Sequence, residues 1–324
     1  MKLTAAALLA AVAVVQPAEL VTRDVYLMGT RAHLSTYASS RTAGMARLEG
    51  ALRVLEEAEQ ELSTWRTDSA ISALNRSPVG RPWQASERVC RMLSSVFGSY
   101  RMTNGTFDPG VGRLIEAWGI HGNGAIPTDA ALSRARAASG LEHFTFERER
   151  CILVRRAEAT LDVGAFGKGE ALDRVHDLAI PDPWMIDLGG QISVGGSRPP
   201  AGAWTVAVAH PLRRDEPHLH VRMTAGSLST SAGSERDQLV NGRRVGHILD
   251  PRTGQPAGFT GSVTVWHQRG LDADALSTAL YVTGPDEGMR WAEERGVAAL
   301  YLIPGNGVSR RMTAAFAPLV IAPE

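Results

Sequence analysis

The chain has 324 residues, and its 34 lysines and arginines are balanced by 34 aspartates and glutamates. A chain of this length can bury a large core in one domain or in two closely joined ones, and the balanced charge disfavours a polyanion partner such as nucleic acid. The two cysteines, Cys90 and Cys151, belong to no CxxC or Cys/His array. The sequence therefore favours neither a structural zinc site nor a disulfide scaffold, and Cys90 is interpreted as a small residue of a helical core face.

Residues 1–18 are predicted to be a signal peptide. One lysine precedes an uncharged run from Leu3 to Val15, which is too short to cross a bilayer as a permanent helix. No cysteine follows the run, so this segment offers no site for a lipid anchor. A buried N-terminal helix is the alternative. The sequence thus predicts export to the periplasm, with no permanent membrane span, of a domain formed by residues 19–324.

The first part of this domain shows strands followed by helices. Residues 24–38 alternate between apolar and polar side chains, which predicts one or two strands broken at Gly29. Apolar residues recur at spacings of three, four and seven over 45–62 and predict an amphipathic helix. Ser69 is a predicted cap of a short helix that ends near Asn75.

A further long helix is predicted over 86–102, stopped by Asn104-Gly105. The segment 106–108 follows, and Pro109 biases Asp108 toward an extended backbone whose peptide edges can face a ligand. A simple polar turn is equally consistent with these residues. Beyond it the pattern predicts a polar helix and a hairpin, at 128–139 and 144–154.

The stretch LDVGAFGKGEALD, 161–173, combines an acid, glycines and a lysine just before a helical pattern. Its glycines allow close backbone approach to a ligand, Lys168 supplies a fixed positive charge, and Asp162 can accept a hydrogen bond from a ribose hydroxyl or a ring nitrogen. The glycine spacing matches neither GxxxxGK[ST] nor GxGxxG, so a standard nucleotide fold is not implied. A strand-to-helix turn with packing glycines is the alternative.

Short strands dominate the second half of the chain. Residues 171–178 predict a helix, and further strands are predicted at 184–188, 204–208, 219–223, 246–249 and 262–266. The first of these strands runs into Gly189-Gly190, whose small residues let a strand end lie against a cofactor. The pattern predicts an α+β fold with antiparallel sheets rather than strict strand-helix alternation.

Oxygen-bearing side chains gather on a predicted helix near residue 275. Asp274 and Thr278 are four residues apart and project from one face, with Ser277 beside them. One carboxylate with neutral oxygens suits Mg²⁺, which completes its octahedron with waters and substrate phosphate. Asp272 or Asp274 as a helix cap is the alternative, and an aspartate in the first turn can do both.

His247 lies just before the turn at 250–254. An imidazole titrates near neutral pH, so this residue could act as a general base or contact a ligand. An isolated histidine in a strand is also commonly structural.

Eight short signatures in order make the chain resemble the ApbE family, the FAD:protein FMN transferases. They are MGT at Met28, STW with SAISALN from Ser63, GTFDPGVGRL with WG from Gly105, LDVGAFGKG from Leu161, DLGG at Asp187, TSAGS at Thr230, HILDPRTG at His247 and DADALSTA at Asp272. The resemblance covers Met28 to about Gly284. It implies an α+β fold, T-fold-like, with mixed or antiparallel sheets flanked by helices and an FAD cleft between two closely joined lobes.

The resemblance also assigns roles to residues. It implies FAD contacts by Met28, Trp65, Thr106, Phe107, Asp108, Asp162, Lys168 and Ile248. It implies a Mg²⁺ site formed by Ala165, through its backbone carbonyl, with Asp274, Ser277 and Thr278, and it leaves His247 as a candidate catalytic base. Without the resemblance, Met28 is core filling and Trp65 is a rim of the core.

The implied reaction transfers FMN from FAD to a Ser or Thr hydroxyl of a separate acceptor flavoprotein with a Ser/Thr-Gly-Ala-Thr type motif, and AMP leaves. The alternatives are a Mg²⁺-dependent FAD pyrophosphatase that gives FMN and AMP, and a protein that only binds FAD. The sequence departs from the family pattern at Glu170, where an aromatic is usual, at Gln191, where an acid is common, and at Gly246, where a polar residue is frequent.

Overall fold

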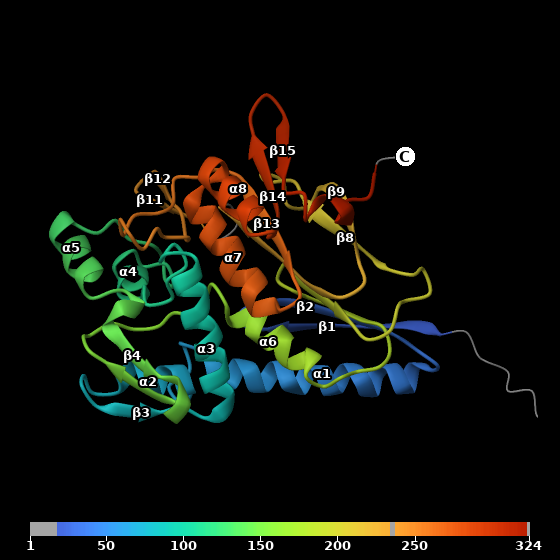
Figure 1. Cartoon of the computed structure of the whole chain (residues 1–324), viewed down its shortest axis with the longest axis horizontal. Helices are drawn as coiled ribbons and strands as arrows, with labels where there is room; N and C mark the ends of the chain where they lie inside the picture. Colours follow the sequence, from blue (N-terminus) through green and yellow to red (C-terminus); the bar gives the residue numbers. More distant parts are fainter. Residues whose placement is uncertain (1–17, 234–236, 323–324) are drawn as a thin grey trace, which may run out of the picture.

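The computed structural model describes residues 18–233 and 237–322 and is built on one large antiparallel sheet (Figure 1). Its strands pair in the order β1-β2-β6-β7-β10-β13-β14-β15, each antiparallel to its neighbours. Their bounds are β1 Glu19–Leu27, β2 Thr30–Ala38, β6 Trp184–Leu188, β7 Gln191–Gly195, β10 Gly226–Ala232, β13 Ser262–His267, β14 Ala298–Pro304 and β15 Val308–Met312.

The predicted break at Gly29 is a two-residue hairpin turn. Leu27 pairs with Thr30, and the two residues between them have positive φ angles, 50° at Met28 and 70° at Gly29. Two consecutive positive φ values match the twist of the flanking strands, so the hairpin closes tightly.

Helices cover one face of the large sheet. They are α1 Arg41–Leu62, α6 Gly167–His176, α7 Gly270–Thr283 and α8 Pro285–Glu294. In Figure 1, α1 runs beneath β1 and β2, and α7 lies beside β13. Helix α7 also packs against β10. Leu48 and Leu55 of α1 and Leu172 of α6 are buried with Leu34 of β2 in the largest apolar core. Burial of these side chains supplies most of the driving force for this packing.

The opposite face of the sheet carries a separate two-stranded hairpin. Its strands are β8 Trp204–Ala209 and β9 Pro217–Met223, and the short helix η3 Ala317–Leu319 packs beside β9. Val206 and Val221 from this hairpin are buried with Leu300 and Phe316 in a second apolar core. The loop between β8 and β9 is thereby held at one fixed place against the sheet.

The remaining elements gather beyond one end of the large sheet, at the left of Figure 1. A three-stranded sheet has the order β3-β5-β4, and a small hairpin pairs β11 with β12. The bounds are α2 Ala70–Arg76, β3 Pro82–Gln84, α3 Glu87–Met102, α4 Gly112–Ala117, α5 Asp129–Ala137, η1 Leu141–His143, β4 Phe144–Glu147, η2 Arg148–Arg150, β5 Ile152–Arg155, β11 Gln238–Val240 and β12 Arg243–Val245.

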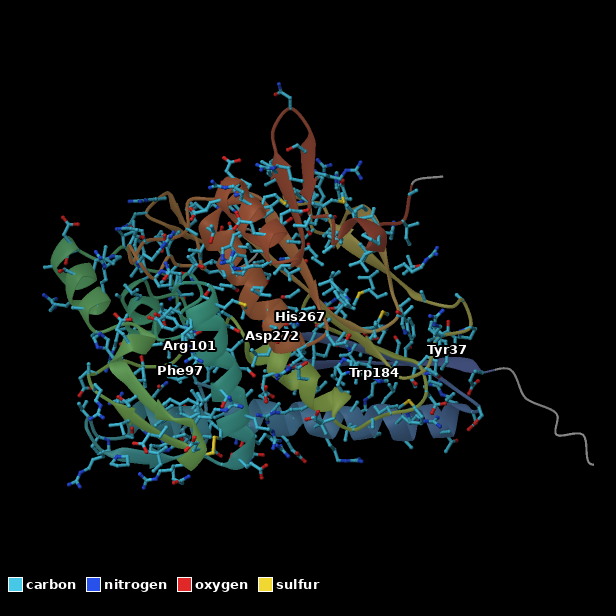
Figure 2. The ribbon with its side chains drawn as sticks, in the orientation of Figure 1. Tyr37, Phe97, Arg101, Trp184, His267 and Asp272 are labelled. Carbon is cyan, nitrogen blue, oxygen red and sulfur yellow. A yellow bond between two sulfur atoms is a disulfide. The ribbon has the colours of Figure 1, made fainter. Side chains whose placement is uncertain are left out.

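The two cysteines form a disulfide, a bond that the sequence did not indicate when it disfavoured a disulfide scaffold. Cys90 of α3 is bonded to Cys151 at the turn before β5, and Figure 2 shows the yellow bond at the lower end of α3. The sequence separation of 61 residues matches no short motif. Only the packing of the β4–β5 hairpin on α3 brings the two sulfur atoms together. Cys90 is nevertheless 5% exposed and part of the apolar core, as expected of its helix face.

Most of the predicted elements are confirmed, including the α+β fold with antiparallel sheets and flanking helices. Ser69 and Ser86 cap α2 and α3 through their hydroxyls, and Asn104 and Gly105 end α3 with positive φ angles. The strand predicted at 246–249 is wrong, because β12 ends at Val245 and the following residues form a loop.

Within the described residues, no helix is both long enough and apolar enough to cross a membrane. The predicted signal peptide lies, except for Ala18, outside the part of the chain that the structure describes.

Candidate active site

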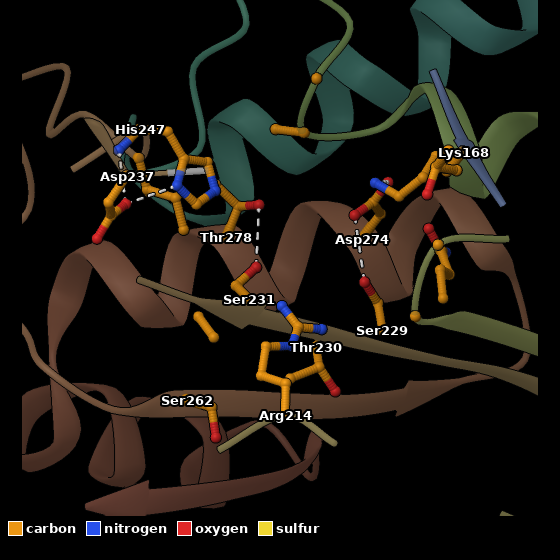
Figure 3. Close-up of a pocket in the computed structure, with 18 of the residues that line it drawn as sticks. Lys168, Arg214, Ser229, Thr230, Ser231, Asp237, His247, Ser262, Asp274 and Thr278 are labelled. Atoms are coloured by element: carbon orange, nitrogen blue, oxygen red, sulfur yellow. Dashed lines mark hydrogen bonds and ion pairs between the residues drawn. The ribbon is translucent and has the colours of Figure 1, made fainter. Parts of the chain in front are cut away.

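A cavity of about 1090 Å³ opens where the large sheet splits. Strand β10 pairs with β13 over 227–232, but its pairing with β7 ends at Leu228. The cavity lies between β7 and the part of β10 that follows Leu228. Figure 3 shows side chains of β10 and α7 that face each other in this region. The predicted residues that line it are Thr106, Phe107, Asp108, Asp162, Ala165, Lys168, His247, Ile248, Asp274 and Thr278. Segments far apart in the sequence therefore meet in one cavity.

Asp274 is the centre of the polar part of the cavity. Its side chain is 6% exposed, and Lys168 Nζ lies 3.8 Å from its Oδ2. The N–H of Gly169 donates to the same oxygen at 3.4 Å, and the hydroxyl of Ser229 donates to Oδ1 at 3.2 Å. A buried carboxylate needs such donors because water cannot solvate it. The predicted cation and the predicted metal ligand are thus neighbours.

A glycine contact between α6 and α7 makes this neighbourhood possible. A Cβ on Gly169 would clash with the backbone of Gly270, and a Cβ on Gly270 would clash with that of Gly169. The two helices therefore touch backbone to backbone at this point. Asp173 of α6 secures the contact, because its carboxylate accepts from the N–H groups of Gly270 and Leu271 at the start of α7. Burial raises the pKa of Asp173, opposed by these two hydrogen bonds.

A row of hydroxyls joins α7 to β10. The Ser277 hydroxyl donates to the backbone oxygen of Asp274 at 3.0 Å and lies 2.9 Å from that of Ser231. Thr278 lines the cavity, with its hydroxyl 3.4 Å from Ser231, whereas Ser277 is fully buried behind it. Ser277 therefore holds the backbone and the neighbouring serines, and Asp274 and Thr278 present their oxygens to the cavity.

The loop after α3 is shaped by the Asp108 carboxylate. Its Oδ1 accepts from the N–H groups of Gly110 at 2.7 Å and Leu141 at 3.0 Å. Burial raises the pKa of Asp108 to about 6 in spite of these bonds. Phe107 is fully buried against Phe166. Both side chains are engaged by the protein, so this loop offers mainly its backbone to a ligand.

Asp162 lies under an aromatic pair at another part of the cavity. Its Oδ2 is 2.6 Å from His121 Nε2, and its Oδ1 accepts from the N–H of Gly164 at 2.8 Å. The ring of Trp65 contacts the His121 ring with centroids 4.9 Å apart. His121 lines the cavity, but Trp65, which is 69% exposed, does not. The structure thus places Trp65 one residue away from the cavity.

Met28 also lies behind the cavity wall rather than on it. Its side chain packs against the main apolar core, and its N–H donates to Glu59 Oε1 at 2.9 Å. The cavity-lining residues next to it in sequence are Gly29 and Thr30.

His247 is held by Asp237, a residue that the sequence did not indicate. His247 Nδ1 is 2.9 Å from Asp237 Oδ1, and the backbone N–H of His247 donates to the same oxygen at 3.1 Å (Figure 3). Burial alone would raise the pKa of Asp237, but hydrogen bonds from His247 and Arg244 outweigh it and hold the pKa below its usual value. An ionised Asp237 accepts from Nδ1–H, which leaves Nε2 as the basic atom of the ring.

The positions that depart from the family pattern have structural partners here. Glu170 is buried in an ion pair with Arg174 at 2.9 Å, and Arg174 in turn contacts Glu61 at 2.8 Å. Burial raises the pKa of Glu170, although Arg174 opposes it. The Gln191 side-chain amide donates to the backbone oxygen of Gly270 at 2.9 Å, next to the α6–α7 contact. These two substitutions support the scaffold and leave Asp274 and Lys168 in place.

The family model of the ApbE family matches residues 28–301, and this chain belongs to that family. The FAD:protein FMN transferase of Vibrio cholerae serotype O1 is 28% identical over 316 residues, which cover 94% of each chain. The crystal structure of the apo flavinyl transferase ApbE of Pseudomonas stutzeri is 28% identical, with a TM-score of 0.83 over 95% of this chain and 99% of that chain. The structure of the ApbE protein of Thermotoga maritima is 26% identical in sequence, with a TM-score of 0.85 over 94% of this chain and 100% of that chain.

Proposed function

We propose that this chain is an FAD:protein FMN transferase that moves FMN from FAD to a Ser or Thr hydroxyl of an acceptor protein. Two relatives that carry this name align over 94% and 82% of this chain. The observation that carries the proposal is the meeting of Asp162, Lys168 and Asp274 in one cavity, although they come from separate segments. A flavin dinucleotide is the ligand whose ring, ribose and diphosphate such separate groups can bind.

The proposed reaction is a displacement at phosphorus. The acceptor hydroxyl oxygen forms a bond to the flavin-side phosphorus of FAD, and the bond from that phosphorus to the oxygen of AMP breaks. AMP leaves with the electron pair, and the hydroxyl proton passes to a base. Catalysis of this kind depends mainly on positioning and on stabilising charge, so the protein needs no nucleophile of its own.

Among this chain's residues, Lys168 and His247 have the clearest roles. Lys168 holds a positive charge beside Asp274, where a diphosphate oxygen would bind. His247, oriented by Asp237, has Nε2 available to take the proton of the acceptor hydroxyl. The acceptor is proposed to carry a Ser/Thr-Gly-Ala-Thr type motif.

The donor set fits Mg²⁺ better than a softer metal. No cluster of three or more His, Cys, Asp or Glu side chains suited to a metal ion is found in the described residues. Asp274, the Thr278 hydroxyl and Ala165 lie on one cavity and offer one carboxylate with neutral oxygens. Mg²⁺ commonly takes few protein ligands and completes its shell with water and phosphate. When bound, it would neutralise charge on the diphosphate.

The test is to incubate the pure protein with FAD and Mg²⁺, with and without an acceptor that carries the motif. We expect mass spectrometry to find one FMN added to the acceptor, and AMP to appear in equal amount. A matched acceptor with its target Thr changed to Val should stay unmodified. Rapid AMP release without acceptor would identify a pyrophosphatase, and FAD binding with no AMP in either case would identify a binding protein.

Export to the periplasm is part of the same proposal. The Cys90–Cys151 disulfide supports it, because disulfides persist in oxidising compartments and are rare in the reducing cytosol. Fractionation of cells with an intact leader tests it. Mature protein in the cytosolic fraction, with both thiols reduced, would contradict it.

A further inference from the structure

Arg214 brings a second permanent positive charge to the cavity. It lies in the loop 210–216 between β8 and β9, and it lines the same cavity as Lys168 and Asp274. Figure 3 shows its guanidinium projecting toward β10, near Thr230 and away from the β8–β9 backbone. Arg214 therefore approaches the cavity from the β8–β9 side, whereas Lys168 belongs to α6.

The loop that carries Arg214 is held by its own hydrogen bonds. The N–H of His210 donates to the backbone oxygen of Glu216 at 2.8 Å, and the N–H of Glu216 donates to that of Arg213 at 3.0 Å. His210 Nδ1 accepts from the N–H groups of Leu212 and Arg213. Arg213 forms an ion pair with Glu216 at 2.7 Å. A loop closed in this way presents Arg214 at a defined place, so less entropy is lost when a ligand binds.

The charges that line the cavity call for a second cation when a diphosphate binds. Lys168 and Arg214 are the permanently charged cations among the described residues of the lining. The carboxylates there are Asp108, Asp162, Asp187, Asp215, Asp237 and Asp274. Lys168 already faces Asp274 at 3.8 Å, and the diphosphate of a dinucleotide adds two negative charges. Arginine matches phosphate oxygens with paired N–H donors.

The backbone opposite Arg214 leaves room for this side chain. A Cβ on Gly190 would lie 3.1 Å from the Arg214 guanidinium, and the φ of Gly190 is +86°. The Gly190 N–H donates to Asp187 Oδ1 at 2.7 Å, which fixes the paired glycines as a tight turn. Burial raises the pKa of Asp187, and Arg214 is among the charges that oppose the rise. The guanidinium thus lies close to the turn where a strand end meets the cavity.

We propose that Arg214 binds the diphosphate of the dinucleotide from the β8–β9 side of the cavity, across from Lys168. This inference rests on the proposed function and adds a residue to its substrate site. Arg214 would hold the diphosphate while the acceptor hydroxyl approaches the flavin-side phosphorus.

The test compares ligands with and without phosphate. Fluorescence titration gives the Kd for FAD and for riboflavin in wild type, Arg214→Gln and Arg214→Lys. We expect Arg214→Gln to raise the Kd for FAD by about 10- to 100-fold and to leave riboflavin within about twofold. The loss should shrink as the salt concentration rises from about 50 mM to about 500 mM, because salt screens the lost attraction. Arg214→Lys should recover part of the affinity, since it keeps the charge and loses the paired donors.

Arg222→Gln is the matched control, because Arg222 is an exposed arginine of β9, in the same hairpin as Arg214, and does not line the cavity. Its Kd values should equal those of wild type. Equal losses for FAD and riboflavin in Arg214→Gln, or an unchanged Kd for FAD, would overturn the assignment. FMN transfer is measured on the same wild-type sample. A wild type that binds FAD but transfers no FMN contradicts the proposed function, and the two titrations still decide the role of Arg214.

Discussion

Loss of the disulfide should lower stability by an amount that follows from the loop it closes. Cys90 and Cys151 are 61 residues apart. Closing such a loop removes about 14 cal/mol/K of entropy from the unfolded chain, which is about 4 kcal/mol at 25 °C. An unfolding entropy of about 2.1 cal/mol/K per residue, applied to 324 residues, converts this into a fall in Tm of about 6 °C.

The assay is thermal unfolding of wild type and of the double variant Cys90→Ala/Cys151→Ala, each with and without dithiothreitol. Alanine is chosen because Cys90 is 5% exposed, and a serine there would bury a hydroxyl. Reductant should lower the Tm of wild type to that of the double variant and leave the double variant unchanged. Neither cysteine lines the large cavity, so FMN transfer well below the Tm should be retained.

The reasoning would be refuted by a double variant that melts within about 1 °C of the oxidised wild type. That result would mean that the unfolded chain already keeps α3 and the β4–β5 hairpin together. A loss of FMN transfer at a temperature where the double variant is fully folded would show instead that the Cys90–Cys151 disulfide influences the active site.

Asp274→Asn should lower FMN transfer at saturating Mg²⁺ by more than about 100-fold without changing the circular dichroism spectrum, because it removes the carboxylate of the proposed Mg²⁺ site; normal turnover would show that the metal assignment is wrong. Asp237→Asn should lower the rate by about 10- to 100-fold, with the Kd for FAD unchanged, because His247 loses the acceptor that orients its ring; a parallel loss of FAD affinity would point to a structural role. The pKa of Asp108 is raised to about 6, so its proton stabilises the folded state below about pH 4 and this contribution is lost as pH rises to about 6. In denaturant unfolding, the free energy of unfolding of Asp108→Asn should therefore rise by up to about 3 kcal/mol relative to that of wild type between pH 4 and pH 7. A difference between the two proteins that does not change with pH would contradict the raised pKa of Asp108. Trp65→Ala should weaken FAD binding in a fluorescence titration through its contact with His121, and an unchanged Kd would end its role in the site.

The elements predicted best from the sequence are those with a strong local signal. The amphipathic pattern over 45–62 and the hydroxyl cap at Ser69 act within one or two turns, and the structure confirms the corresponding helices. The break at Gly29 is equally local, since the turn needs positive φ angles. Such features depend on neighbouring residues, so one sequence is enough to read them.

Strand β10 shows where local patterns fail. Its sequence GSLSTSA is rich in small polar residues, which have weak strand preference, and it resembles a loop. Ser229 and Ser231 are buried in a strand because β13 pairs on one side and α7 covers them with Asp274 and Ser277. The structure of this segment is decided by tertiary contacts.

The sequence also did not predict which residues from distant segments contact the site residues. Motif order indicated Lys168, Asp274 and His247, and all three line one cavity. Asp237 belongs to none of the quoted motifs, and its contact with His247 depends on the loops around β11 and β12. Arg214 likewise has no local signal, because its position depends on how β8 and β9 pack on the sheet.

The backbone contact between Gly169 and Gly270 has a consequence for how this protein can vary. Any larger residue at either position would wedge α6 away from α7 and carry Lys168 away from Asp274. The absence of a Cβ atom at these two glycines thus sets the distance between Lys168 and Asp274. Even alanine at either position would push the two side chains apart. Laboratory evolution of this chain toward other dinucleotides should therefore change the cavity wall and keep both glycines.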